Sequence, residues 1–346
     1  MRVLSYASGL GLITLTVYIM VVGRDLIVPF LVSVVIWFLI NTLADYYHKI
    51  QIYSYRIPKS LCFIASLITT IIALWIIVDM VGNNIADVKA AAPMYQENLL
   101  KLSGRVYDLL GIENQTSLTQ LINQIDLRPF ISNIAGTLAS LAGSAGLIMI
   151  YVLFIFLEQA SFNTKLKALL NGSKHTNTVE DIIRTIHTKI ETYVAIKTFV
   201  SILTGTACYI VLILNDVDYA SFWAFIIFLL NYIPTVGSML AVLFPAILSL
   251  VQFPTFTPFL IILSSLATIQ VLIGNILEPK LMGNSLNLSP LVVMLSLALW
   301  GSIWGIAGMF LSVPFTVILM IIFSEFPSTK PIAIILSQSG KIGSDK

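Results

Sequence analysis

The few charged residues in the C-terminal half of the sequence are the first candidates for a chemical role. From Tyr219 to Ser324 the sequence contains only two of them, Glu278 and Lys280. Ionisable groups inside a membrane are costly and commonly functional, so Glu278 is a candidate for proton or cation coupling. The alternative is a Glu278–Lys280 arrangement on the surface at the end of a span. One carboxylate without a nucleophile or a partner acid is not a hydrolytic site, and we expect neither an enzyme nor a cofactor.

Uncharged polar residues, prolines and glycines gather around two interruptions of the same apolar block. The candidate substrate-binding residues are Asn231, Pro234, Thr235 and Gly237 at the first break, Gln270 and Asn275 on the intervening span, and Trp300, Gly301, Ser302, Trp304 and Gly305 at the second. Such donors and acceptors suit a small polar solute in a dry cavity. For Asn231 and Asn275 a helix-to-helix hydrogen bond is an equal alternative. The two tryptophans fit either an apolar wall or simple packing, and the glycines fit tight helix packing.

The composition determines the kind of element that positions these residues. Of 346 residues, 58% are hydrophobic and only 10% are charged, and the mean hydropathy is +0.94. An ordinary soluble domain has roughly a quarter of its residues charged. The chain therefore cannot make a soluble surface, which excludes a soluble enzyme, a nucleic-acid binder and a disordered protein. We predict an all-α polytopic membrane protein.

The apolar runs predict about eight membrane segments. Six have the length of one crossing, about 20 residues, and cover residues 4–22, 26–43, 61–81, 135–157, 193–214 and 259–277. Two further runs, Tyr219–Gln252 and Pro290–Phe323, would each make a helix of about 51 Å against a core of about 30 Å. Because both runs are interrupted in the middle, we expect two broken or re-entrant hairpins in the C-terminal half. Tilted or kinked full spans are the alternative.

The order of apolar runs and polar stretches divides the chain into five parts. These are N-terminal spans 1–82, an external amphipathic helical segment 83–134, a span with a cytoplasmic amphipathic helix 135–192, a transport core 193–326 and a tail 327–346. Basic residues concentrate in the loops after the second and fourth spans, which predicts cytoplasmic N- and C-termini. Lys197 lies one turn into the fifth span. Snorkelling to the cytoplasmic interface explains it, and a substrate-anion contact is the alternative.

Spaced motifs in the C-terminal half resemble those of the AI-2E family, the autoinducer-2 exporter-like proteins or PerM-type permeases. The motifs are Asn231-x-x-Pro234-x-x-Gly237, Asn275-x-x-x-Pro279-x-x-x-Gly283, Leu288-Ser289-Pro290, Trp300-Gly301-x-x-x-Gly305-x-x-Gly308 and Pro314. The sequence departs from the family pattern at Ser238, where a proline is frequent, and at Ser289, where a histidine is common. Neither departure breaks the hairpin geometry.

The resemblance implies an inner-membrane protein that exports small molecules, with autoinducer-2 as the best named substrate. It also implies a homo-oligomer, of which a pentamer is the family type, and an elevator-like motion. The partners expected are a small-molecule substrate and the lipid bilayer, with no nucleic acid. We place the substrate site between the two hairpin tips. The alternatives are a sodium or other cation/proton antiporter that uses Glu278, and a non-transporting membrane scaffold.

Overall fold

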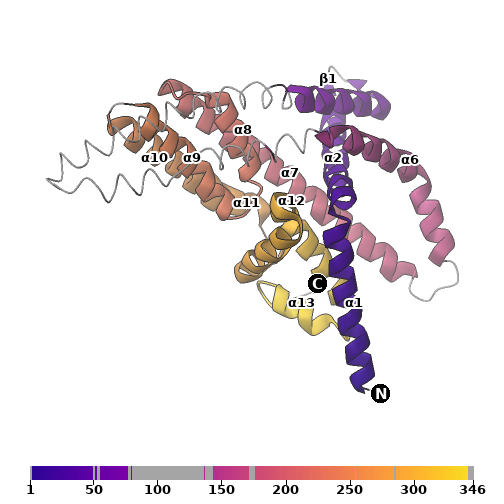
Figure 1. Cartoon of the computed structure of the whole chain (residues 1–346). Helices are drawn as coiled ribbons and strands as arrows, with labels where there is room; N and C mark the ends of the chain where they lie inside the picture. Colours follow the sequence, from indigo (N-terminus) through magenta and orange to yellow (C-terminus); the bar gives the residue numbers. More distant parts are fainter. Residues whose placement is uncertain are drawn as a thin grey trace. The chain divides into compact units, whose positions relative to one another are not determined.

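A computed structural model describes residues 2–49, 51–52, 55–76, 79, 136, 143–170, 176–253, 255–283 and 286–341 (Figure 1). These residues are almost entirely helical, and the strands among them are the short antiparallel pair β1 (Gln51–Ile52) and β2 (Tyr55–Arg56). The predicted external segment, residues 83–134, lies outside the described residues. The chain forms two compact units, each assembled from segments that are far apart in the sequence.

Unit 1 combines the two ends of the chain with a central segment, and it comprises residues 1–67, 144–196 and 282–346. Its complete helices are α1 (Arg2–Val22), α2 (Arg24–Lys49), α6 (Ala145–Leu170), α12 (Pro290–Glu325) and α13 (Lys330–Leu336). The indole Nε1 of Trp37 on α2 donates to the side-chain oxygen of Gln159 on α6 over 2.9 Å. The rings of Phe30 and Tyr151 meet edge to face at 5.6 Å between the same two helices. A polar and an aromatic contact therefore fix α2 against α6.

Helix α12 turns back on itself near its middle. Gly305 has φ 63° and ψ −139°, a conformation that essentially only glycine adopts. The ring centroids of Trp300 and Phe315 are 4.9 Å apart, although a straight helix would separate these residues by about 22 Å along its axis. A Cβ atom at Gly308 would overlap the carbonyl oxygen of Trp300. Two helical arms thus approach each other closely around the predicted second break.

Unit 2 is built from the helices on either side of the first predicted break. Its described part contains α7 (Thr176–Leu214) from Lys197 onward, α8 (Ala220–Leu230), α9 (Val236–Gln252), α10 (Thr257–Gln270), the π-helix η1 (Val271–Leu277) and most of α11 (Glu278–Met282). The side chain of Gln252, at the end of α9, accepts from the amide of Asp218 over 2.9 Å and donates to the carbonyl oxygen of Asp216 over 2.7 Å. Because Asp216 and Asp218 precede α8, the start of α8 lies beside the end of α9. The pair is a helical hairpin.

The core of unit 2 fills the space between α7, the hairpin α8–α9 and α10. Leu212, Ile227, Ile262 and Leu266, one or two from each of three helices, are almost completely buried. Burying a leucine or isoleucine side chain contributes roughly 1.5–3 kcal/mol. The apolar periodicity of these helices therefore accounts for the packing that holds the hairpin against α7 and α10.

Five helices among the described residues are long and apolar enough to cross a membrane, or six if the bent helix α6 counts as one span. The five are Arg24–Lys49, Lys59–Ile76, Thr178–Leu214, Thr257–Met282 and Pro290–Glu325. The prediction of a helical membrane protein with several spans is confirmed at this level. The total of about eight segments stays a prediction, as do the re-entrant nature of the hairpins and the limits of the five predicted parts of the chain.

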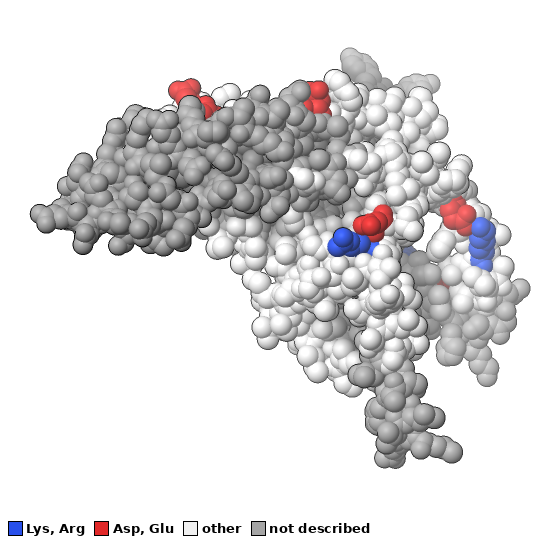
Figure 2. Space-filling view, viewed as in Figure 1, with Lys and Arg blue, Asp and Glu red and all other residues white. Residues whose placement is uncertain are grey.

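The surface of the described residues agrees with a membrane environment. On the face shown in Figure 2 most of the described surface is uncharged, and the acidic and basic side chains stand in a few separate places. Large apolar side chains such as Leu12, Trp75 and Leu291 are more than two-thirds exposed. Exposed apolar surface on this scale is unfavourable in water and favourable against lipid.

Candidate functional site

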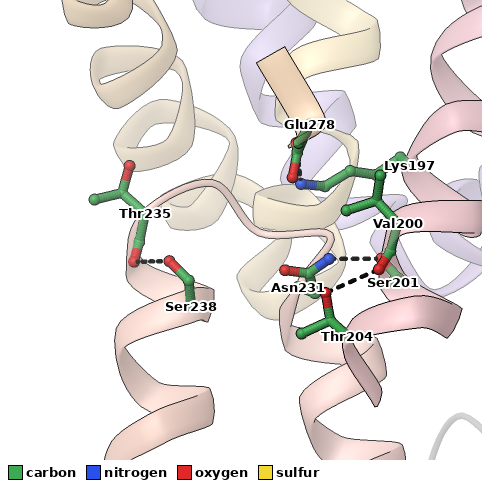
Figure 3. Close-up of polar contacts among 8 residues, drawn as sticks. All are labelled: Lys197, Val200, Ser201, Thr204, Asn231, Thr235, Ser238 and Glu278. Carbon is green, nitrogen blue, oxygen red and sulfur yellow. Dashed lines mark hydrogen bonds and ion pairs between the residues drawn. The ribbon is translucent and has the colours of Figure 1, made fainter. Parts of the chain in front are cut away.

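A polar face of α7 forms the centre of the candidate site in unit 2. Lys197, Ser201 and Thr204 follow one another at spacings of four and three residues, which places them on one side of the helix. All three are buried, in the part of α7 that belongs to unit 2. Figure 3 shows Glu278 and Asn231 directed toward this face. The helix therefore gathers polar groups from two other elements of unit 2.

Lys197 forms an ion pair with Glu278 at the upper end of this face. The ammonium nitrogen lies 2.5 Å from Oε1 of Glu278, and the two side chains are only 5% and 17% exposed. The predicted snorkelling of Lys197 is wrong, because its ammonium group is buried against a carboxylate. Lys280 is exposed, so the charge partner of Glu278 is not its neighbour in the sequence. Pairing removes the large cost of two isolated charges in apolar surroundings.

A π-helix positions Glu278. The seven residues of η1 follow α10 directly, and the amide of Glu278 donates to the carbonyl oxygen of Ile273, five residues earlier. A π-turn is wider than an α-turn and so changes the direction in which the following side chains point. Short π segments inside helices occur frequently at functional sites. In this chain the π-helix ends at the one acidic side chain of the apolar block.

The tip of the hairpin α8–α9 is tied to the same helix by two hydrogen bonds. Nδ2 of Asn231 donates to Oγ of Ser201 over 3.0 Å, and the hydroxyl groups of Tyr232 and Thr198 lie 2.7 Å apart. Asn231 is buried. Of the two roles left open by the sequence, the structure shows the helix-to-helix hydrogen bond of Asn231, whereas a substrate contact stays a prediction. The hairpin tip is thus held by side-chain polarity as well as by apolar packing.

The chain reverses at the tip through a tight turn. The amide of Val236 donates to the carbonyl oxygen of Pro234 over 2.6 Å, and Thr235 between them has φ 58° and ψ −59°. This is the rare γ-turn with positive φ, which is strained for a β-branched residue. A Cβ atom at Gly237 would overlap the carbonyl oxygen of Leu230, so the returning arm requires glycine there.

Thr235→Gly is expected to raise the melting temperature of the purified protein. Positive φ at a residue with a side chain costs about 1–3 kcal/mol, and glycine loses roughly 0.5–1 kcal/mol more backbone entropy on folding. The expected net gain in free energy of unfolding is about 1 kcal/mol. Thr235→Ala is the matched control, because it keeps the Cβ atom and therefore the strain. Equal gains from both variants would show that the turn geometry is not the cause.

The other predicted residues of unit 2 differ in their surroundings. Gln270 is buried at the end of α10, and Asn275 is exposed on η1. Asn275 therefore does not point toward the buried face of α7 occupied by Ser201. No local signal in the sequence predicts which of these two amides is buried, because both lie in the same apolar stretch.

The predicted residues of the second break belong to unit 1. Trp300 and Trp304 are buried and stacked, with ring centroids 5.1 Å apart, and Nε1 of Trp304 donates to the carbonyl oxygen of Met20 over 3.0 Å. Of the two alternatives for the tryptophans, these contacts favour packing. Ser302 is exposed and donates to the carbonyl oxygen of Leu299. A Cβ atom at Gly301 would come within 3.0 Å of the Met309 side chain, which agrees with close packing of the two arms.

The sequence analysis missed four members of the site: Thr198, Ser201, Thr204 and Tyr232. A usable signal was present, because Lys197, Ser201 and Thr204 have helical spacing within an apolar span. Among the described residues, no group of three or more His, Cys, Asp or Glu side chains lies close enough together to hold a metal ion. The site is therefore an ion pair and a set of hydroxyl and amide groups.

Ionisable groups buried inside a helical membrane protein commonly mark a substrate or ion pathway, and the family match of this chain agrees with that role. The chain belongs to the AI-2E family of transporters, whose family model matches residues 10–328. This is a family of transporters and not of enzymes.

Three relatives show how far the similarity extends. The AI-2 transport protein TqsA of Escherichia coli (strain K12) is 31% identical over 325 residues, which cover 92% of this chain and 91% of the relative. A putative transport protein of Borreliella burgdorferi is 32% identical over 252 residues, covering 71% and 68% of the two chains. The putative transport protein YhhT of Escherichia coli (strain K12) is 25% identical over 319 residues, covering 91% and 88%.

Proposed function

We propose that this chain exports small, uncharged polar solutes across the inner membrane, with an autoinducer-2-like signal as the best named substrate. The observation that carries the proposal is the buried polar face of α7, which holds Asn231 and Glu278 inside an apolar unit. The name of the relative TqsA, an AI-2 transport protein that aligns over most of both chains, supports the choice of solute.

The charge of the cluster favours an uncharged solute. Lys197 and Glu278 neutralise each other at 2.5 Å, so the groups around the hairpin tip offer hydroxyl and amide partners without net charge. A solute with several hydroxyl groups can form hydrogen bonds to such partners without leaving a charge unpaired. A cation/proton antiporter would require Glu278 to leave Lys197 during every cycle, and for that reason we rank it second.

The hairpin dimensions support alternating access by a re-entrant element. Helix α8 has 11 residues and α9 has 17, whereas a crossing needs about 20. We propose that the hairpin enters the membrane and returns, that its tip contributes Asn231 and Thr235 to the solute site, and that an elevator-like movement exposes the site to each side. Cytoplasmic termini and a homo-oligomer, with a pentamer as the family type, complete the proposal.

Solute flux in proteoliposomes that contain the purified chain tests this function. Autoinducer-2 is loaded inside, and a pH gradient or a sodium gradient is imposed in parallel samples. Movement of autoinducer-2 with wild-type protein, absent from protein-free liposomes, is the expected result. Proton or sodium movement without any autoinducer-2 flux would replace the proposal by the antiporter.

Asn231→Ala is expected to lower autoinducer-2 flux by about 10-fold or more, the effect of one or two lost hydrogen bonds, with normal expression and oligomeric state. Ser201→Ala is the matched variant, because it removes the same interhelical hydrogen bond and keeps the Asn231 amide. If Asn231 contacts the solute, its variant loses more flux than the Ser201 variant. Equal losses would assign Asn231 a purely structural role.

A further inference from the structure

The side-chain amide of Gln270 is buried and has no hydrogen-bond partner among the described residues. Gln270 is only 7% exposed, and neither Nε2 nor Oε1 is hydrogen-bonded to another part of the protein that the structure describes. It is the last residue of α10, and η1 begins at the next residue. Two polar atoms of one side chain are thus left unpaired beside the π-helix.

An unpaired amide in apolar surroundings is energetically unfavourable. Burying such a group without a hydrogen bond costs roughly 1–3 kcal/mol by protein measurements, and most buried polar side-chain atoms in proteins have a partner. A leucine at this position would pack in the apolar unit without that cost. The packing of the residues that the structure describes therefore does not explain this amide.

Space for a ligand atom exists next to this amide. Gly274 lies one turn further along the same helical segment, on η1. A Cβ atom built there would have one neighbour within 4 Å outside its own helix backbone, Oε1 of Gln270 at 3.5 Å. The missing side chain at position 274 thus leaves a space the size of a methyl group beside the buried Oε1.

The chemistry of the amide selects the ligand group. Nε2 donates hydrogen bonds and Oε1 accepts them. A bare cation suits only the oxygen, and a carboxylate suits only the nitrogen. A hydroxyl group both donates and accepts, so one or two hydroxyl groups satisfy both atoms.

We propose that the amide of Gln270 and the notch at Gly274 bind a hydroxyl group of the transported solute. The inference rests on the proposed function and deepens it, because it names neutral hydroxylated molecules as the substrate class and Gln270 as a specificity-determining residue. It also assigns a role to the π-helix. This segment places Gly274 next to Gln270, and it ends at Glu278.

The test compares binding of autoinducer-2 with binding of an analogue that lacks one hydroxyl group. Equilibrium dialysis is carried out with the full-length protein in lipid nanodiscs. A site built to hydrogen-bond a hydroxyl group rejects the deoxy analogue strongly, so at least one such analogue is expected to bind wild-type protein about 10-fold or more weakly. Gln270→Leu is expected to bind autoinducer-2 more weakly, so that it no longer discriminates between autoinducer-2 and the deoxy analogue. Its melting temperature without solute is expected to be unchanged or raised.

Gly274→Ala provides an independent variant, because it fills the notch, leaves the amide in place and favours the helix. It is expected to weaken autoinducer-2 binding about 10-fold with a normal melting temperature. Val271→Ala, at an exposed position of the same π-helix, is the control and keeps the discrimination. If Gln270→Leu and Gly274→Ala both retain wild-type discrimination, the inference is overturned and the proposed function stands. Loss of folding in Gln270→Leu together with unchanged binding in Gly274→Ala also overturns it.

Failure of the proposed function gives a different pattern. Wild-type protein that binds autoinducer-2 with the expected discrimination but shows no flux in proteoliposomes would refute transport and support the Gln270 site. Wild-type protein that binds neither autoinducer-2 nor its analogue would overturn both.

Discussion

Lys197→Met alone is expected to destabilise the folded protein by about 3–5 kcal/mol, the usual cost of removing one partner from a buried ion pair. The Glu278 carboxylate would remain 17% exposed and without the ammonium group that neutralises it at 2.5 Å. Glu278→Gln is expected to have an effect of the same sign, because it leaves the ammonium of Lys197 buried. The melting temperature of purified protein in detergent measures both effects.

The double variant Lys197→Met/Glu278→Gln is expected to recover most of the lost stability. Replacing both members of a buried pair by uncharged groups is often neutral, since neither charge then requires desolvation. A double-mutant cycle of the four proteins isolates the interaction between the two side chains. Lys280→Met is the control, because Lys280 is exposed and lies two residues from Glu278. Additive losses in the double variant would show that the two charges do not depend on each other.

Gly237→Ala is expected to prevent correct folding, with a loss in free energy of unfolding of more than about 4 kcal/mol. The new Cβ atom would overlap the carbonyl oxygen of Leu230 and lie 3.0 Å from Cβ of Ile233. Both neighbours belong to the turn itself, so the clash cannot be relieved by rotating a flexible side chain. The expected observation is a low yield of monodisperse protein and a lowered melting temperature.

Gly308→Ala is expected to give the same result in the other hairpin, where the new atom would overlap the carbonyl oxygen of Trp300. Gly146→Ala on α6 is the control, because a Cβ atom there has nothing within 4 Å. Alanine favours a helix over glycine by about 1 kcal/mol, so this variant is expected to be neutral or slightly stabilising. Wild-type yield and melting temperature for Gly237→Ala or Gly308→Ala would show that the arms of that hairpin do not approach as the structure has them.

Several features of the fold were predictable because their causes are local. The low charge content requires a membrane environment, and the first two apolar runs became the helices Arg2–Val22 and Arg24–Lys49. Both interruptions fell where predicted, at Asn231–Gly237 and around Gly305. At these places proline and glycine alter the backbone conformations that the chain can adopt, which is a property of each residue and its neighbours.

The candidate site was only partly predictable, because its contacts join residues that are distant in the sequence. Glu278 and Asn231 were singled out from the sequence as polar residues in an apolar block, and the structure brings both to the polar face of α7. Their partners on α7 were not predicted, since Lys197 and Glu278 are 81 residues apart and no local pattern pairs them. Among the predicted residues, the burial of Gln270 and the exposure of Asn275 also depend on which face of the helix meets its neighbours.

The sequence by itself determined that this protein is a helical membrane protein and where its two long apolar runs are interrupted. These properties follow from hydropathy, run length and the backbone preferences of glycine and proline, which act over a few residues. Only the tertiary structure decided that Lys197 neutralises Glu278, that Ser201 holds Asn231 and that the amide of Gln270 has no hydrogen-bond partner among the described residues. Packing of separate helices decides such contacts, because a side chain finds its partner only after the helices have docked.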